Sequence, residues 1–186
     1  MANEIQQEMI HALASATIWH PEDELDSVVQ FRADLILFTE YDEQIPIAEI
    51  TGYVMRFVDD AHELWLNLDA ISTDAAELGS VATRVFDLDD ELEFMQPDVL
   101  CIDRMRIADK YRGNRLTSII IDKLATVLQV QPGNTVVVLV PVPQKSTGGS
   151  EEDSPRYKTY LKKLKAAYED AGFTKVGHGM YQIWDE

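Results

Sequence analysis

The sequence has only one cysteine, Cys101, among its 186 residues. A single cysteine excludes an intramolecular disulfide framework and a cysteine-rich zinc site. Histidine is also scarce, and the four that occur are scattered without a metal-ligand spacing: His11, His20, His62 and His178. No structural metal is therefore expected.

Long apolar runs are missing as well. The longest uncharged run lies around residues 135–142, far below the ~20 residues that a membrane-spanning helix needs. Residues 1–10 carry two glutamates and no basic stretch, so they do not resemble a signal peptide. The sequence predicts a cytoplasmic protein with no membrane partner.

Basic residues are rare in the first half of the chain. Residues 1–99 hold 23 acidic and 3 basic residues, whereas residues 100–186 hold 10 and 13. The net charge of −17 argues against nucleic acid as a partner. Ten of the 16 basic residues lie in two segments, 104–115 and 156–165. These clusters are either solvent-exposed helix residues or an anion-binding site. In the second case, the acidic first half of the chain would face a cationic group.

The composition, 46% hydrophobic and 26% charged, suits one domain over residues 1–186. Its start has apolar residues at helical spacing within 3–14, namely Ile5, Met9, Ile10 and Leu13. This spacing predicts a short helix, followed by a linker to residue 26. Alternating apolar residues over 27–39 and 46–58 predict an antiparallel hairpin with a bulge at Gly52.

Residues 59–98 form a predicted helical insertion that ends in an acidic loop. Ser72 is a capping residue for a helix through Phe86. Residues 60–69 fit either a helix or a strand, because their leucines alternate. Residues 87–98 are expected to be the acidic loop.

In residues 99–186, predicted strands and helices alternate. The sequence predicts a strand over 99–108, a basic turn over 111–115, a helix over 116–128, a buried strand over 135–142, a helix over 155–171 ended by Gly172, and short strands over 173–176 and 180–184. The whole order predicts an α/β fold, with a mixed sheet and a strand–turn–helix–strand unit.

The basic turn at 111–115 runs directly into the helix that starts at Leu116. The first N–H groups of a helix lack intrahelical acceptors and lie at the positive end of its dipole. A phosphate group fits such a place, and Gly113 lets the backbone approach a ligand closely. A basic turn before a helix is also a common solvated loop, so this segment alone leaves both readings open.

The segment Arg112-Gly113-Asn114-Arg115-Leu116-Thr117 follows an apolar strand, and Tyr168 stands four residues before Gly172-Phe173. Both motifs resemble those of the GNAT superfamily of N-acetyltransferases. The first is similar to its acyl-CoA-binding motif, Arg/Gln-x-x-Gly-x-Gly/Ala. Arg115 stands where glycine is usual, and Thr117 where glycine or alanine is usual. The stretch from Tyr168 to Gly172-Phe173 resembles the C-terminal Tyr-x-x-x-Gly-Phe signature of the same superfamily.

The resemblance implies the GNAT fold: a mostly antiparallel sheet that splits between two parallel central strands, with helices on both faces. With its insertion at 59–98, the chain looks most like bacterial GNAT-like proteins that have helices before the cofactor strand. Residues 99–186 would then be the acyl-CoA-binding half.

The same resemblance implies acetyl-CoA, or another acyl-CoA, as the cofactor. The cofactor-binding positions that it implies are Met105, Ile107, Ala108, Arg112, Gly113, Asn114, Arg115, Leu116 and Thr117. The acceptor would be a small-molecule or peptide amine, and a cationic one if the acidic half frames the acceptor cleft. A homodimer is left open.

The transfer of an acyl group to an amine needs a base for the amine, a donor to the thioester oxyanion and an acid for the leaving thiolate. Tyr168 matches the frequent general acid of the superfamily, or it is a core tyrosine. Asp103 is a candidate base, or it forms an ion pair with a neighbour such as Arg104 or Arg106. Glu49 is a weaker base candidate.

Other chemically capable residues are expected to be structural. Cys101 has no identifiable histidine partner, so we expect a small core residue. His178 is expected in a solvated turn. We expect packing roles for the three tryptophans, Trp19, Trp65 and Trp184.

Two further functions compete with the acyltransferase. One is a non-catalytic GNAT-like module that binds acyl-CoA or acts through protein contacts. The other is a phosphate- or nucleotide-binding α/β protein that shares only the basic turn. The residues at Arg115 and Thr117 favour the module, whereas Tyr168 favours the enzyme.

Overall fold

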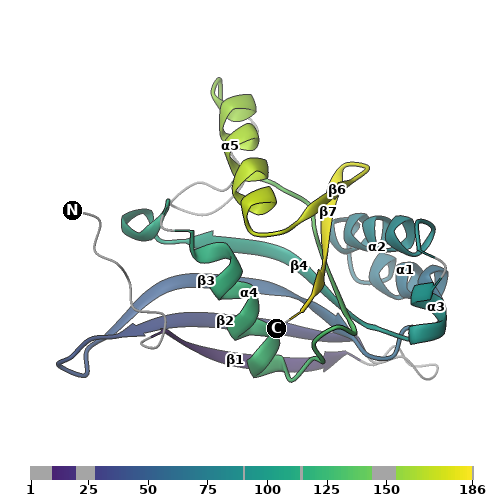
Figure 1. Ribbon diagram of the computed structural model, residues 1–186, viewed down its shortest axis with the longest axis horizontal. Helices are drawn as coiled ribbons and strands as arrows, with labels where there is room; N and C mark the ends of the chain where they lie inside the picture. The colour runs from purple at the N-terminus through teal and green to yellow at the C-terminus, as the bar shows by residue number, and fades with distance from the viewer. Residues whose placement is uncertain (1–9, 20–27, 90, 114, 144–153, 186) are drawn as a thin grey trace.

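The computed structural model describes residues 10–19, 28–89, 91–113, 115–143 and 154–185. Its described part contains one mixed sheet of seven strands in the order β1-β2-β3-β4-β5-β7-β6 (Figure 1). The strands are β1 (Ile10–Trp19), β2 (Val28–Phe38), β3 (Gln44–Met55), β4 (Asp98–Ile107), β5 (Thr135–Leu139), β6 (Thr174–Val176) and β7 (Gly179–Trp184). The helices are α1 (Ala61–Asp69), α2 (Thr73–Phe86), α3 (Glu91–Met95), α4 (Leu116–Leu128) and α5 (Tyr157–Asp170), with a 3₁₀ turn, η2 (Asp109–Tyr111).

Strands β1 to β4 form an antiparallel meander, and β5, β7 and β6 form a second antiparallel group. The two groups join through the parallel pair β4–β5. The helix α4 connects these parallel strands, as such a crossover requires. The predicted mixed α/β sheet and the hairpin over β2 and β3 are therefore confirmed.

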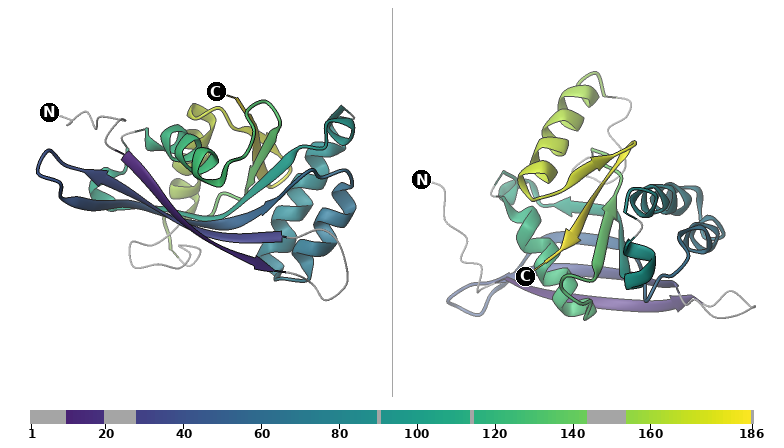
Figure 2. Two further views of the ribbon diagram at one scale, coloured as in Figure 1. Left: turned by 90° about the horizontal axis from the view of Figure 1, so that it is seen from below. Right: turned by 45° about the vertical axis from the view of Figure 1, so that its right-hand side comes forward.

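The helices cover both faces of the sheet (Figure 2). Along β4, Leu100 and Ile102 belong to the apolar core beneath α4, whereas Val99 and Cys101 belong to the core beneath α1 and α2. This alternation follows from the two-residue period of a strand. Both faces are buried here, which explains the nearly continuous apolar runs of β4 and β5.

The insertion between β3 and β4 is helical, as expected. Asp60 caps α1 by accepting hydrogen bonds from the backbone N–H groups of His62 and Glu63, and Ser72 caps α2 through the N–H of Ala75. Residues 61–69 are thus a helix, which decides between the two alternatives for this stretch. The prediction of an acidic loop was only partly correct. Residues 91–95 form the short helix α3, whose Leu92 is buried.

The predicted N-terminal helix is wrong over residues 10–14, which lie in β1. Residues 3–9 and 20–27 lie outside the described residues. The strand β1 pairs with β2 without interruption from Ile10↔Leu37 to Trp19↔Val28. Ten consecutive cross-strand pairs outweigh a local spacing of four apolar residues, since strand preference depends on the neighbouring strand.

The strand β5 ends at Leu139 rather than at residue 142. Pro141 and Pro143 follow it, and proline has no N–H with which to continue a ladder. The central strand is therefore short, whereas its neighbour β4 continues to Ile107. In the part of the chain that the structure describes, no helix is long and apolar enough to cross a membrane.

Candidate functional site

A bulge divides β4 where the parallel pairing ends. Thr51 pairs with Arg104 and Gly52 pairs with Ile102, so Asp103 has no partner residue in β3. A side chain at Gly52 would collide with the carbonyl oxygen of Cys101 and with a neighbouring ring, which explains the glycine at this place. The bulge expected at Gly52 is only partly confirmed, because Gly52 pairs regularly with Phe31 in β2 and the extra residue, Asp103, belongs to β4. The bulge bends β4 where its pairing with β5 ends.

Beyond the bulge, β4 is paired on one side only. Its pairing with β5 ends at Ile102↔Leu139. The N–H of Ala108 donates to the carbonyl of Ile47 at 2.9 Å, and hydrogen-bonded and non-hydrogen-bonded pairs alternate along an antiparallel ladder. Met105 and Ile107 therefore direct their backbone N–H and C=O groups away from β3, toward the gap that β5 leaves.

A cavity of about 910 Å³ opens at this gap. The end of β4, η2, the first turn of α4, the segment after β5 and one side of α5 enclose it. Figure 1 shows α5 standing above this end of the sheet. The described residues that line the cavity are Met105, Ile107, Asp109, Tyr111, Arg112, Gly113, Arg115, Leu116, Thr117, Ser118, Val142, Pro143, Tyr160, Lys163, Leu164, Ala167, Tyr168, Asp170 and Ala171.

The first turn of α4 faces the cavity without a side-chain cap. Arg115 occupies the N-cap position with φ 54°, and it makes no capping hydrogen bond. Leu116, Thr117 and Ser118 follow it on the cavity wall. Their N–H groups are donors that the helix itself cannot satisfy, so this wall attracts a negative group. Gly113 has φ +78° and open space around it, which leaves room for a ligand beside the turn.

Charged side chains on the cavity wall are mixed, with three cations and two carboxylates: Arg112, Arg115, Lys163, Asp109 and Asp170. Arg112 is held in place, because its Nε donates to the carbonyl of Ile107 at 3.0 Å and its Nη1 lies 2.9 Å from Asp109. Arg115 and Lys163 form no ion pair among the described residues, so they carry the cationic character of the wall.

One face of α5 forms an apolar part of the wall, next to Lys163 and Asp170 of the same helix. Tyr168 is the only buried residue of this helix. Tyr160, Leu164, Ala167 and Ala171 lie on the same side, facing the cavity, at the spacing of one helix face. A ligand with an apolar chain would cover this face, while its anionic end would lie at α4.

Tyr168 contributes a phenol to the cavity. Its side chain is 7% exposed, and its ring packs edge-on against Phe173 with centroids 5.6 Å apart. Burial raises the pKa of Tyr168 to about 12, because a phenolate is costly away from water. The hydroxyl has no hydrogen-bond partner among the described residues. Tyr168 is therefore a neutral phenol at neutral pH, able to donate its proton to a ligand.

The cavity brings together most of the residues that the sequence assigned to the cofactor: Met105, Ile107, Arg112, Gly113, Arg115, Leu116 and Thr117. Ala108 instead lines a neighbouring cavity of about 350 Å³. Asn114 lies outside the described residues. The predicted acid, Tyr168, lies on the wall of the larger cavity, whereas the predicted base, Asp103, does not.

Asp103 lies on the other face of β4, toward α2. Its carboxylate lies 3.5 Å from the Nε of Arg104 and 3.4 Å from the hydroxyl of Thr51. Partial burial raises its pKa, and the nearby Asp74 adds to this effect against the opposing influence of Arg104. Asp103 is therefore in an ion pair, and its carboxylate binds a proton more tightly than that of an ordinary aspartate. A general base needs such a raised pKa.

Glu49 is less suited to act as a base. Its two oxygens lie 2.7 Å from Arg32 and 3.0 Å from Arg106. Both carboxylate oxygens are occupied by guanidinium groups, so Glu49 forms part of a charged network on the surface of β2, β3 and β4. Asp103 is the better base candidate of the two.

Several residues of the cavity were missed by the sequence reasoning. The side of α5 is the clearest case, since Tyr160, Leu164, Ala167 and Ala171 already show helical spacing with Tyr168. This spacing could be read from the sequence, but a helix face packed in the core shows the same spacing. Val142 and Pro143 carry no sequence signal of their own, because their role depends on where β5 stops.

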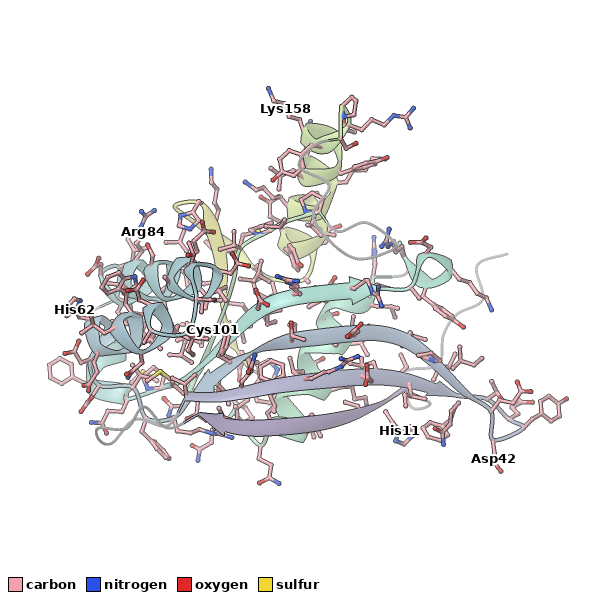
Figure 3. The ribbon with its side chains drawn as sticks, turned by 180° about the vertical axis from the view of Figure 1, so that it is seen from behind. His11, Asp42, His62, Arg84, Cys101 and Lys158 are labelled. Atoms are coloured by element: carbon pink, nitrogen blue, oxygen red, sulfur yellow. The ribbon has the colours of Figure 1, made fainter. Side chains whose placement is uncertain are left out.

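The other reactive residues have structural positions. Cys101 is buried between the sheet and α1–α2 (Figure 3), and burial raises its pKa to about 12. His178 is exposed in the turn before β7. The Trp184 ring nitrogen donates to Asp122 at 3.1 Å, and Trp65 stacks on His62. The side chain of Trp19 lies outside the described residues.

Among the described residues there is no group of three or more His, Cys, Asp or Glu side chains that could hold a metal ion. The chain matches no protein-family model, no curated protein and no solved structure.

Proposed function

We propose that the protein is a GNAT-like N-acyltransferase that uses acetyl-CoA, or another acyl-CoA, and acts on an amine. One observation carries the proposal. The unpaired edge of β4 at Met105, the uncapped start of α4 and the phenol of Tyr168 all meet in the same cavity. The strand order, with a parallel central pair that separates after the bulge, supports the GNAT resemblance of the sequence motifs.

The groups that line the cavity support an acyl-CoA as its ligand. The pyrophosphate would accept hydrogen bonds from the first turn of α4, beside Arg115 and Lys163. The pantetheine would follow β4 and the apolar side of α5. Its thioester carbonyl would accept a hydrogen bond from the backbone N–H of Met105, which the β3–β4 ladder does not use.

These positions support the following course for the proposed reaction. The amine nitrogen attacks the thioester carbonyl, a C–N bond forms and the oxyanion is stabilised by the Met105 N–H. The C–S bond then breaks, and the Tyr168 hydroxyl gives its proton to the departing thiolate. Burial raises the pKa of a thiol as well as that of a phenol. Proton transfer from the phenol to the thiolate therefore stays feasible inside the cavity.

The acceptor amine would approach from the other face of β4, where Asp103 lies. There Asp103 and Asp74 flank Arg104 at 3.5 and 3.4 Å. A carboxylate with a raised pKa can take the proton of the amine, directly or through a water molecule. Two carboxylates at this face support the expectation of a cationic acceptor.

A screen of primary amines against acetyl-CoA, with release of free thiol as the readout, tests the proposal. The parent protein should acetylate at least one class, and polyamines should react better than neutral amines. Tyr168→Phe should lower turnover by ~10²-fold or more while binding of acetyl-CoA changes little, since the hydroxyl acts only as the thiolate forms. A rate in Tyr168→Phe within about threefold of the parent would remove the assigned role.

One observation favours the second candidate, a non-catalytic acyl-CoA-binding module. The predicted base, Asp103, does not line the cavity that holds Tyr168 but lies across the strand in an ion pair with Arg104. The module would bind acetyl-CoA as tightly as an enzyme and release no thiol with any amine. Binding without turnover across the amine screen would therefore decide for the module.

A further inference from the structure

Large apolar side chains are exposed at the corner where the helical insertion meets the sheet. Phe94 is 88% exposed, Leu88 68%, Phe57 64% and Met95 46%. Two of them belong to α3, one precedes it and one follows β3. Single exposed apolar residues are ordinary, but aromatic residues and methionine grouped on a surface are typical of binding surfaces.

Backbone hydrogen bonds hold these segments next to one another. The N–H of Val58 donates to the carbonyl of Pro97 at 2.9 Å, which places Phe57 beside the end of α3. The N–H of Leu92 donates to the carbonyl of Asp89 at 3.1 Å, so the chain turns into α3 shortly after Leu88. Figure 1 shows α3 at this corner, below α1 and α2. We call the surface formed by Phe57, Leu88, Phe94 and Met95 the α3 corner.

The α3 corner is surrounded by acidic residues. Residues 59–98 contain 12 aspartates and glutamates and a single basic residue, Arg84. The exposed acids nearest in sequence to the four apolar residues are Asp59, Asp60, Asp87 and Glu91. None of them forms a salt bridge within the described part of the chain. Their charges therefore stay available to a partner.

We propose that the α3 corner is a docking surface for a basic amphipathic segment of a partner protein, such as a helix with leucines on one side and lysines on the other. Apolar contact with Phe94, Met95, Phe57 and Leu88 would supply affinity, and the surrounding acids would select a cationic partner and speed its association. A second copy of this chain is a poor occupant, because two chains of net charge −17 would bring like charges together.

The corner is separate from the proposed acyl-CoA cavity, since none of its four residues lines that cavity. Docking here would therefore recruit the protein to a partner, or a partner to the protein, without occupying the cofactor site. The inference does not depend on the acyltransferase proposal.

The test uses a fluorescent synthetic helix of leucine and lysine, with all leucines on one face, and measures its anisotropy with the full-length protein at physiological salt. The double variant Phe94→Ser/Met95→Ser should weaken binding by about tenfold or more, the loss expected for central interface residues. The matched control is Tyr41→Ser, because Tyr41 is 85% exposed and precedes Asp42, at the end of the molecule opposite His62 (Figure 3). Binding to this control should stay within about twofold of the parent.

A second pair of variants tests the charges. Asp59→Asn/Glu91→Gln should weaken binding more than the equally charged change Asp42→Asn/Glu43→Gln at the far end. A helix with alanines in place of its leucines should bind at least about tenfold more weakly than the leucine helix. Melting curves of all variants check that they fold, and any that unfolds is replaced by Phe94→Gln alone.

Three results would overturn the proposal. The first is equal binding by the Phe94/Met95 variant and the Tyr41 control. The second is equal binding of the alanine helix, which would show charge attraction without a surface. The third is self-association in sedimentation equilibrium that Phe94→Ser abolishes, because it would make a second copy the occupant.

Discussion

Asp103 and Met105 are two residues apart in β4, but they serve opposite faces of the sheet. The bulge leaves Asp103 without a partner in β3. Its carboxylate lies on the α2 face, as the alternation from Val99 and Cys101 requires, whereas the N–H of Met105 points into the gap beside β5. A single strand thus separates a carboxylate with a raised pKa from the proposed oxyanion donor. In the proposed reaction, the acceptor and the thioester would meet across β4 where β5 ends at Leu139.

The raised pKa of Asp103 predicts a pH-dependent effect of Asp103→Asn on stability. The folded state binds the proton more tightly than the unfolded state, so ionisation costs stability as the pH rises above the ordinary aspartate value and through the raised value. The melting temperature of Asp103→Asn minus that of the parent should therefore increase between about pH 4 and pH 7. A difference that decreases over this range would show that the ion pair with Arg104 outweighs burial.

Tyr168→Phe should leave the stability of the fold almost unchanged. The hydroxyl has no partner among the described residues, so its removal leaves no buried group unsatisfied. We expect a change in unfolding free energy of less than about 0.5 kcal/mol, measured by urea denaturation. A loss of about 1.5 kcal/mol or more would indicate a structural hydrogen bond, and would argue against a proton that is free for catalysis.

The alkaline side of the pH–rate profile provides an independent test of Tyr168. Since its pKa is about 12, the phenol stays protonated and turnover should not fall between pH 7 and about pH 10. Rates should instead rise as the acceptor amine loses its proton. A decline of the parent rate near pH 9, absent in Tyr168→Phe, would contradict the neutral phenol.

Arg56 has a structural role that the sequence does not reveal. Its guanidinium lies 2.6 Å from Asp98, which is 3% exposed, and donates to the carbonyls of Leu128 and Gln129 at the end of α4. Arg56→Ala leaves a buried carboxylate without its cation and should cost about 2–3 kcal/mol of unfolding free energy. The matched control, Arg32→Ala, removes an exposed ion pair with Glu49 and should cost at most about 1 kcal/mol. Equal losses in chemical denaturation would refute this difference.

The fold was largely predictable because its elements follow local patterns. The helix α4 begins and ends as the apolar stripe indicates, and β2, β3 and β4 alternate or run apolar over nearly their full lengths. The strand β1 was missed because its apolar residues also fit a helix, and only pairing with β2 decides between the two. The end of β5 was misplaced because the valines continue to Val142 beyond Pro141.

The residues of the candidate cavity were predictable where they are neighbours in the sequence. They were not predictable where segments distant in the sequence come together in the fold. The turn from Arg112 to Thr117 is local, and so is the position of Tyr168 before Gly172. That Asp103 and Met105, two residues apart, serve different faces of β4 follows from the bulge, which no spacing reveals. The contribution of Lys163 follows from where α5 stands above the sheet.

The backbone at Arg115 predicts opposite effects of one substitution on stability and on binding. Its φ of 54° is a conformation that favours glycine, so Arg115→Gly should add about 1 kcal/mol of stability over Arg115→Ala. Both variants lose the same charge, and both should therefore bind CoA more weakly than the parent. Gln129→Gly, at φ 56° and at the other end of α4, should gain stability without any change in CoA binding.

Isothermal titration of acetyl-CoA into the protein tests the central claim most directly. The cavity at the start of α4 should bind one acetyl-CoA per chain, and Arg115→Ala and Lys163→Ala should each weaken that binding by about fivefold or more, as lost charge-assisted contacts predict. Lys162→Ala is the control, because Lys162 is exposed on α5 and does not line the cavity, and it should bind like the parent. No heat of binding at about millimolar acetyl-CoA, or equal weakening by all three variants, would contradict the assignment of this cavity to an acyl-CoA.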